Sequence, residues 1–163
     1  MDSEKTNLLD KVTRLHFFLF DILSGKNPST VRVAQSNLIK FDNKEATLFG
    51  SVYAIDDPLR LGLEPTTKII GNAQGLYLSS SRDPTKFTMV LYADFAFTTG
   101  KFNGSSFNVF SWNPVTETDC EVVVVGGREK FRFARGYAKV KSSYFNATTG
   151  DVVLDYHVTL IHY

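Results

Sequence analysis

The residue best placed to do chemistry in this sequence is an aspartate inside a strongly apolar run, residues 15–24. At the two-residue period of a β-strand, Asp21 shares one face with Phe17 and Leu19, and the opposite face is also apolar. Such a strand is covered on both sides, so the carboxylate is either hydrogen-bonded in the interior or lines a cavity that admits a ligand. Because burial raises the pKa of a carboxyl group toward neutrality, Asp21 is a candidate proton donor or acceptor.

A second candidate group lies in residues 71–77, where glycines interrupt a strand-like pattern. The spacing of these glycines is not that of a phosphate-binding loop at the start of a helix, which argues against nucleotide binding. Gly75 in mid-strand predicts a bulge or a close approach by a ligand, and Tyr77 and Ser79 share its face. Two roles stay open for Tyr77, a packed core aromatic or a hydroxyl that contacts a ligand.

The roles of four other charged residues are open. Asp94 is a lone acid among apolar residues, and its position leaves open whether it lies on the inner or the outer face. Asp56 and Asp57 precede Pro58. We interpret them as residues at the end of a strand, where they stabilise a turn and have a structural role. Arg135 either contributes to substrate binding or forms a buried ion pair with one of these acids.

The histidines and the cysteine suggest no further reactive site. His16, His157 and His162 have no metal-ligand spacing, so we expect no metal. Cys120 is the only cysteine, which excludes an intrachain disulfide, and no base adjoins it. Since Gly-x-Ser-x-Gly is also absent, nucleophilic catalysis is disfavoured.

Short strands separated by turns must position these groups, because helical periodicity is confined to residues 7–14. The candidate strands cover roughly residues 15–23, 46–56, 68–79, 86–98, 105–111, 119–125, 131–142 and 151–162. About eight strands joined by hairpins favour a closed antiparallel barrel whose interior holds one small ligand. We therefore predict an all-β protein, with a lead-in over residues 1–14 and a single barrel domain over residues 15–163.

Composition limits the classes of partner expected for this domain. The chain has 163 residues, a net charge of +1 and scattered basic residues, which argues against nucleic acid or a membrane surface as partner. No segment approaches the ~20 apolar residues of a membrane span. The outer face of residues 86–97 still carries Val90, Tyr92 and Ala96, so we expect another subunit to cover it in a homo-oligomer.

Evidence on secretion is mixed. The first six residues lack the basic start and apolar stretch of a signal peptide. Two N-glycosylation sequons nevertheless begin at Asn103 and Asn146, both in turn-like sequence. They would fit a secreted protein whose leader has been removed.

Several stretches, in their order and spacing, resemble the plant dirigent family. They are Phe-Asp-Ile-Leu-Ser-Gly at 20–25, Ile-Asp-Asp-Pro at 55–58, Ala-Gln-Gly-Leu-Tyr at 73–77, Gly-Gly-x-x-x-Phe at 126–131 with Ala-Arg-Gly at 134–136, and the closing residues 150–163. The resemblance implies an eight-stranded antiparallel barrel of the dirigent and allene oxide cyclase type, a homotrimer, secretion to the apoplast and a phenolic ligand. The family's pocket acid and pocket tyrosine fall on Asp21 and Tyr77.

Differences from the sequences of the lignan-forming members indicate which branch of the family this chain resembles. The chain has Ser79, Asn113 and Cys120 where those members usually have Tyr, Asp and Arg, so the polar residues expected to bind substrate differ. Residues 26–34 are similar to those of the pterocarpan synthase branch. That resemblance implies loss of water from a 2′-hydroxyisoflavanol through a quinone methide, in phytoalexin biosynthesis.

In the implied reaction Asp21 is the general acid, Tyr77 hydrogen-bonds the substrate, and no cofactor is needed. The alternative is a non-enzymatic dirigent protein that directs phenoxy-radical coupling in lignan or lignin formation. A plain carrier of apolar ligands is the third reading.

Overall fold

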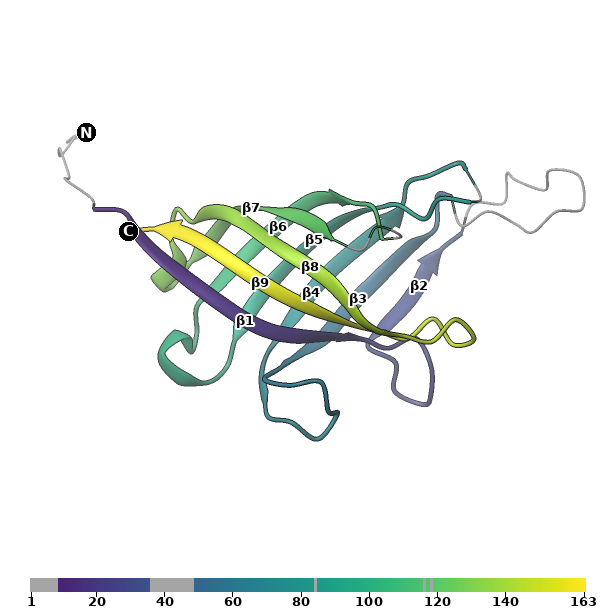
Figure 1. The fold of residues 1–163 in the computed structure, drawn as a ribbon, viewed down its shortest axis with the longest axis horizontal. Coiled ribbons are helices and arrows are strands. Elements are labelled where there is room, and N and C mark those ends of the chain that lie inside the picture. Colours follow the sequence, from purple (N-terminus) through teal and green to yellow (C-terminus); the bar gives the residue numbers. More distant parts are fainter. Residues whose placement is uncertain (1–8, 36–48, 84, 116, 118) are drawn as a thin grey trace, which may run out of the picture.

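Nine β-strands and two short 3₁₀ helices form the described part of the chain, residues 9–35, 49–83, 85–115, 117 and 119–163 of a computed structural model (Figure 1). The strands are β1 (Lys11–Asp21), β2 (Thr30–Ala34), β3 (Val52–Arg60), β4 (Ile69–Ser79), β5 (Met89–Phe97), β6 (Ser106–Asn113), β7 (Cys120–Arg128), β8 (Arg135–Phe145) and β9 (Val152–His162). The helices are η1 (Gly100–Phe102) and η2 (Glu129–Phe131). No helix within the described residues is long and apolar enough to cross a membrane.

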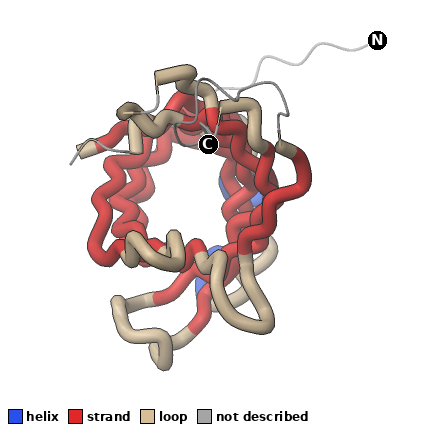
Figure 2. Tube along the Cα trace, turned by 90° about the vertical axis from the view of Figure 1, so that its right-hand side faces the viewer, coloured by secondary structure: helices blue, strands red, loops and turns tan. Residues whose placement is uncertain are grey.

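Antiparallel pairing closes the sheet into a barrel. From β3 to β9 each strand pairs with the next one in the chain, and β9 pairs with β1 from Lys11 to Asp21. β1 then pairs with β3, which completes the ring seen end-on in Figure 2. The predicted eight-stranded barrel is confirmed, and β2 is an additional strand beside β3.

Two-residue alternation separates the inside of the barrel from the outside, as the hydrophobic pattern predicts. In β5, the side chains of Met89, Leu91 and Phe95 are buried, whereas Tyr92 is exposed. Asp94 also lies on the outer face, where it accepts a hydrogen bond from Asn108 at 2.6 Å.

Some predicted boundaries are wrong. Residues 11–14, expected in a helix or lead-in, already belong to β1, while residues 1–8 lie outside the described residues. The predicted turn at Asp57 and Pro58 is absent, since β3 continues through both to Arg60. β2 lies in a segment for which the hydrophobic pattern predicts a connection and no strand. Residues 46–48 of the second candidate strand lie outside the described residues.

Gly75 marks a close approach between strands rather than a bulge. Its pairing with Ala93 on β5 is regular, and a Cβ atom at Gly75 would lie 2.0 Å from the carbonyl oxygen of Tyr92. The glycine therefore lets the backbones of β4 and β5 come together where the barrel wall bends.

Aromatic side chains fill the barrel end formed by the end of β5 and the start of β6. Phe131, which η2 carries inward, is fully buried, with its ring centroid 4.8 Å from that of Phe102. Phe95 stacks on Phe107 at 4.9 Å, one layer further in. This end is a packed core with offset and edge-to-face ring contacts.

Candidate functional site

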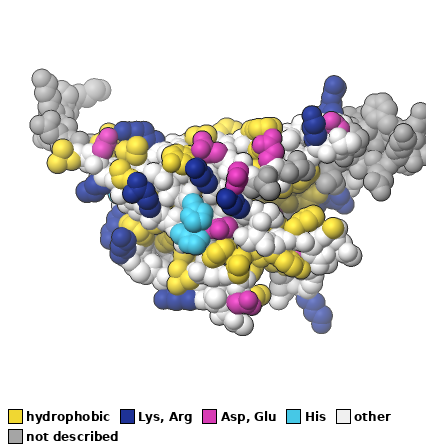
Figure 3. Space-filling view, viewed as in Figure 1, with side chains coloured by type: hydrophobic (Ala, Val, Ile, Leu, Met, Phe, Trp, Pro, Cys, Tyr) yellow, Lys and Arg dark blue, Asp and Glu magenta, His cyan; other side chains and the backbone are white. Residues whose placement is uncertain are grey.

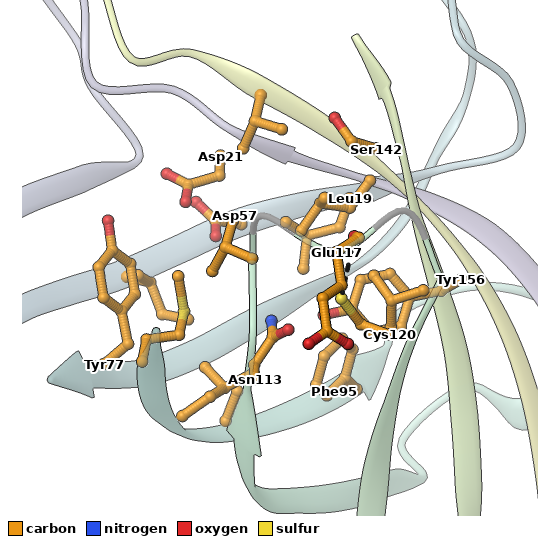
Figure 4. Close-up of a pocket in the computed structure, with 18 residues that line it drawn as sticks. Leu19, Asp21, Asp57, Tyr77, Phe95, Asn113, Glu117, Cys120, Ser142 and Tyr156 are labelled. Atoms are coloured by element: carbon orange, nitrogen blue, oxygen red, sulfur yellow. Dashed lines mark hydrogen bonds between the residues drawn. The ribbon is translucent and has the colours of Figure 1, made fainter. Parts of the chain in front are cut away.

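The opposite end of the barrel is hollow. The ends of β1, β4 and β8 and the starts of β3, β5 and β9 surround a cavity of about 530 Å³, a size typical of small-ligand sites. A narrower extension reaches toward the barrel centre. Most of the lining is apolar, and Figure 4 labels its polar side chains. These are Asp21, Asp57, Tyr77, Asn113, Glu117, Cys120, Ser142 and Tyr156.

Asp21 is the last residue of β1, and its carboxyl group lies inside the barrel. The side chain is 8% exposed, and its Oδ1 atom has no hydrogen-bond partner among the described residues. Burial raises the pKa of Asp21 to about 6; the charge of Asp151 adds to this rise and a hydrogen bond from Thr30 opposes it. The side chain lines the cavity, one of its oxygens is buried without a partner in the described part of the chain, and the carboxyl group can hold a proton near neutral pH.

Asp57, on β3, lies beside Asp21 and completes a carboxyl pair (Figure 4). Its Oδ1 accepts hydrogen bonds from the hydroxyl groups of Ser29 at 2.6 Å and Thr30 at 3.2 Å. Burial raises the pKa of Asp57 to about 8; the charge of Asp21 raises it further, and the two hydroxyl groups lower it. Two such groups titrate together, so the pair retains a proton that neither carboxyl would hold alone in water.

A break in strand pairing creates the space for this pair. β3 pairs with β2 only as far as Ile55, opposite Thr30, and with β1 only at Leu59 and Arg60. Between these contacts β3 has no strand on that side, so Pro58, which lacks a backbone N–H, costs no ladder hydrogen bond there. The interpretation of Asp57 as a turn residue is therefore wrong for a physical reason: the proline lies at an interrupted ladder inside a strand.

Tyr77 lies on the cavity wall at the end of β4. Its ring stacks on that of Tyr53, with centroids 4.7 Å apart. Burial, followed by the charge of Asp21, raises the pKa of Tyr77 above its ordinary value, so the hydroxyl stays protonated as a donor. Ser79, two residues on, is buried but does not line the cavity or its extension.

Asn113 and Cys120 lie in the deeper extension, on strands β6 and β7. The Oδ1 atom of Asn113 is buried and has no hydrogen-bond partner among the described residues, so the wall of the extension contains an unsatisfied acceptor. The Cys120 thiol lies 3.1 Å from the carbonyl oxygen of Pro114, to which it donates, and burial raises the pKa of this thiol. It is therefore a protonated wall residue and a poor nucleophile.

Comparison with known proteins identifies the family that shares this barrel and cavity. The sequence profile described as "Dirigent-like protein" matches residues 12–161. Dirigent protein 15 of Arabidopsis thaliana is 53% identical over 156 residues, which cover 94% of this chain and 82% of that protein. The chain belongs to the dirigent family.

Within the family, the comparisons include pterocarpan synthases. Pterocarpan synthase 1 of Glycine max is 41% identical over 155 residues, covering 94% of this chain and 81% of the relative. The solved structure of the pterocarpan synthase dirigent protein GePTS1 superposes with a TM-score of 0.86 at 37% identity, covering 98% of this chain and 89% of that one.

Other residues singled out in the sequence lie outside the cavity of this dirigent protein. Arg135 is exposed and pairs with Asp10 at 3.0 Å, so the expected buried ion pair with Asp21, Asp56, Asp57 or Asp94 does not form. Asp56 points outward, where it accepts a hydrogen bond from Asn72 at 2.8 Å. The sequon residues Asn103 and Asn146 both lie in turns: Asn103 follows η1, and the Asn146 side chain caps the β8–β9 turn.

Five residues that bring polar groups to the cavity or its extension were not among the predicted site residues, namely Tyr53, Asp57, Glu117, Ser142 and Tyr156. A signal for Asp57 exists in the sequence, because Tyr53, Ile55 and Leu59 share its face if the two-residue period is continued through the proline. Glu117 comes from a loop and Tyr156 from the far end of the chain, so no local pattern places them at the site.

Proposed function

We propose that this dirigent protein is a dehydratase that closes an ether ring, converting a 2′-hydroxyisoflavanol to a pterocarpan. The observation that carries the proposal is the buried carboxyl pair: Asp21 lines a largely apolar cavity of about 530 Å³, and Asp57 beside it lines the narrower extension. Its similarity to pterocarpan synthases at about two residues in five supports the substrate class. The product would be a plant defence compound.

The reaction requires one proton to be delivered and one to be recovered. Asp21, as the acid, protonates the benzylic hydroxyl of the substrate; the C–O bond then breaks and water leaves. Electrons from the phenol para to that carbon, which keeps its own proton, give a protonated quinone methide. The 2′-hydroxyl attacks the same carbon, the new C–O bond closes the ring, and the carboxylate takes up the released proton. The sum is loss of one water, with no electrons gained or lost.

Asp57 assists by holding the proton of the pair. Ser29 and Thr30 hold one oxygen of Asp57, and burial raises the pKa of both carboxyl groups, so the pair keeps a proton for Asp21 to deliver. Tyr77 accepts a hydrogen bond from the phenolic O–H through its hydroxyl oxygen as positive charge develops there. The apolar wall excludes bulk water, which would otherwise trap the quinone methide.

The second candidate is a non-enzymatic dirigent protein that binds phenoxy radicals made by a separate oxidase. The relative at 53% identity, whose name states only that it is a dirigent protein, favours this reading as much as the first. In that case the cavity only orients two phenolic rings, and the carboxyl pair serves as a hydrogen-bonding wall.

An oxidase-free assay separates the candidates. Purified protein is incubated with a 2′-hydroxyisoflavanol in chelator-containing buffer, and loss of one water is followed by mass spectrometry. The proposal predicts catalytic conversion that a matched Asp21→Asn variant loses. Stereochemical bias seen only with added oxidase would support the second candidate, and binding without either reaction would indicate a carrier.

The proposal extends to assembly and location. Leu76, Tyr92 and Phe110 lie opposite one another on β4, β5 and β6 and expose an apolar row on the outer face. Such a row is expected to be covered in a homotrimer, and secretion to the apoplast with glycans on Asn103 and Asn146 fits exposed turns. Analytical ultracentrifugation of Phe110→Glu, with Phe133→Glu as an exposed control, tests the assembly: only the first should dissociate.

A further inference from the structure

Two histidines and an aspartate meet on the outer surface of the barrel, over the seam between the first and last strands. His16 of β1 lies directly opposite His157 of β9, and Asp155 precedes His157 by two residues on the same face. Figure 3 shows histidine side chains together near the centre of the face that β1 and β9 present. The sequence could not reveal the cluster, because 139 residues separate His16 from Asp155.

The donor atoms of the three side chains converge. His16 Nε2 lies 2.8 Å from Asp155 Oδ1, and His157 Nε2 lies 3.3 Å from the same oxygen. One ligand atom from each residue falls within 4.8 Å of the other two. The imidazole rings stack with centroids 4.2 Å apart and an angle of 11° between their planes, so both present their edges to the carboxylate.

We propose that His16, Asp155 and His157 bind a divalent transition-metal ion of the Zn²⁺ class. Two imidazoles and one carboxylate form a donor set that suits Zn²⁺ or Cu²⁺ and leaves Mg²⁺ and Ca²⁺, which prefer oxygen, poorly served. Three protein ligands leave a fourth tetrahedral position for water. The carboxylate brings the charge, and each neutral imidazole brings a lone pair once its proton resides on Nδ1.

The geometry fits such an ion with small adjustments. Bonds of about 2.0–2.2 Å in a tetrahedron place neighbouring donor atoms about 3.4 Å apart. The distances to Asp155 Oδ1, 3.3 Å from His157 Nε2 and 2.8 Å from His16 Nε2, fall short of that value, so the donor atoms must move slightly apart to admit the ion. Both histidine side chains are about half exposed, at 51% and 54%, so their rings are free to turn toward the ion.

Neighbouring charged side chains affect the affinity of this site for the metal ion. Lys139 and Lys141 of β8 lie opposite His157 and Asp155, and Arg14 precedes His16 by two residues on the same face. Lys141 is partly neutralised by an ion pair with Asp119 at 3.1 Å, and Glu121 lies opposite Lys139. The cations oppose metal binding through space, so the site is expected to be weaker than an all-acidic one.

A bound ion would join the two ends of the chain. β1 and β9 form one long seam of the barrel, and an ion held by both strands binds the folded protein but finds no preformed site in the unfolded chain. Binding therefore raises the unfolding temperature, by an amount that grows with free metal concentration.

Calorimetric titration of tag-free protein with Zn²⁺ tests the proposal, with Mg²⁺ as a negative control. We expect one saturable site per chain. Replacing any one ligand, in His16→Gln, His157→Gln or Asp155→Asn, should weaken binding at least tenfold, since the loss of even an outer-shell partner costs about 10–100-fold. Asp119→Asn makes the same charge change on a neighbouring exposed carboxylate; because it frees the charge of Lys141 but removes no ligand, it should weaken binding less than any ligand replacement.

Thermal unfolding provides an independent reading. Zn²⁺ should raise the unfolding temperature of the parent and of Asp119→Asn, and should leave that of the three ligand variants unmoved. The proposal is overturned if the ligand variants bind Zn²⁺ within threefold of the parent, or if Asp119→Asn loses binding equally. It is also overturned if Zn²⁺ does not bind the parent at all, in which case the cluster is only a stacked pair of histidines, one of them hydrogen-bonded to Asp155.

Discussion

The two ends of this barrel are built from the same strands and differ in what fills them. At one end Phe97, Phe107 and Phe131 close the interior with packed rings. At the other, Asp21 and Asp57 line an open cavity. The change occurs where strand pairing between β1 and β3 stops, so an interrupted ladder and an unfilled interior coincide.

The comparison teaches how a small barrel tolerates buried carboxyl groups. Burial of an unpaired charge costs free energy. The carboxyl pair lowers that cost by keeping a proton and by accepting hydrogen bonds from the hydroxyl groups of Ser29 and Thr30. The remaining cost is offset by the aromatic end, which buries large apolar side chains. The aromatic end of the barrel thereby stabilises the fold, and the opposite end holds the groups of the proposed chemistry.

Asp21→Asn should have the largest effect on the hollow end. Removing one positioned proton-transfer group is expected to lower turnover of the isoflavanol about 10²- to 10⁴-fold, because an amide cannot deliver the proton. Steady-state kinetics measures this effect, and sedimentation checks that the variant still folds and assembles. Asp94→Asn, the same change on the outer face, is the matched control, and near-parental turnover by Asp21→Asn would exclude the role.

Phe131→Ala should affect the packed end instead. Truncating this fully buried ring is expected to lower the free energy of unfolding by about 3–5 kcal/mol, through lost burial and the cavity left behind. Urea unfolding measures the change. Turnover per folded molecule should stay at the parental level, and a parallel loss of turnover would show that the two ends are not independent.

Stability should fall as pH rises through the range in which the carboxyl pair titrates. The folded-state pKa values, about 6 for Asp21 and about 8 for Asp57, exceed the ordinary value of 3.8, so the folded state binds more protons than the unfolded one. This contribution is complete below about pH 4 and is lost as pH rises through 6 and then 8. Urea unfolding of the parent and of Asp57→Asn at several pH values tests it.

Asp57→Asn should flatten that dependence, because an amide oxygen still accepts the hydrogen bonds from Ser29 and Thr30 without titrating. Equal slopes in the parent and Asp57→Asn would mean that Asp57 is ionised in the folded state at neutral pH.

Tyr77→Phe should have the smallest effect of the set. Loss of one hydrogen bond to a developing charge is worth about 1.5–3 kcal/mol, which predicts a fall in turnover of about ten- to a hundredfold. Its stacking on Tyr53 remains, so stability should hold. A fall in kcat without a change in KM places the hydrogen bond in the transition state, whereas a rise in KM alone assigns Tyr77 to substrate binding.

Sequence reasoning predicts the parts that follow from local periodicity. The barrel, the inward side of β5 and the burial of Asp21 all follow from two-residue alternation. Asp57 was missed because an Asp-Pro pair normally marks a turn, and only the pairing of β3 with two different strands shows that the ladder is interrupted there.

Long-range contacts account for what else the sequence could not reveal. The cluster of His16, Asp155 and His157 depends on the register between the first and last strands, which no local motif encodes. Arg135 sits in a motif that resembles those of the family, yet the registry of β8 turns its side chain outward. Position on a strand, and not residue type, decides whether a polar group reaches the cavity.

Titration of the aspartate carboxyl carbons by ¹³C NMR tests the central claim most directly, because it reads the protonation of the pair without a substrate. Two resonances are expected to titrate well above the ordinary value of 3.8, one disappearing in Asp21→Asn and the other in Asp57→Asn. If every aspartate titrates near the ordinary value, the hollow end holds no proton at neutral pH and the proposed acid catalysis is contradicted.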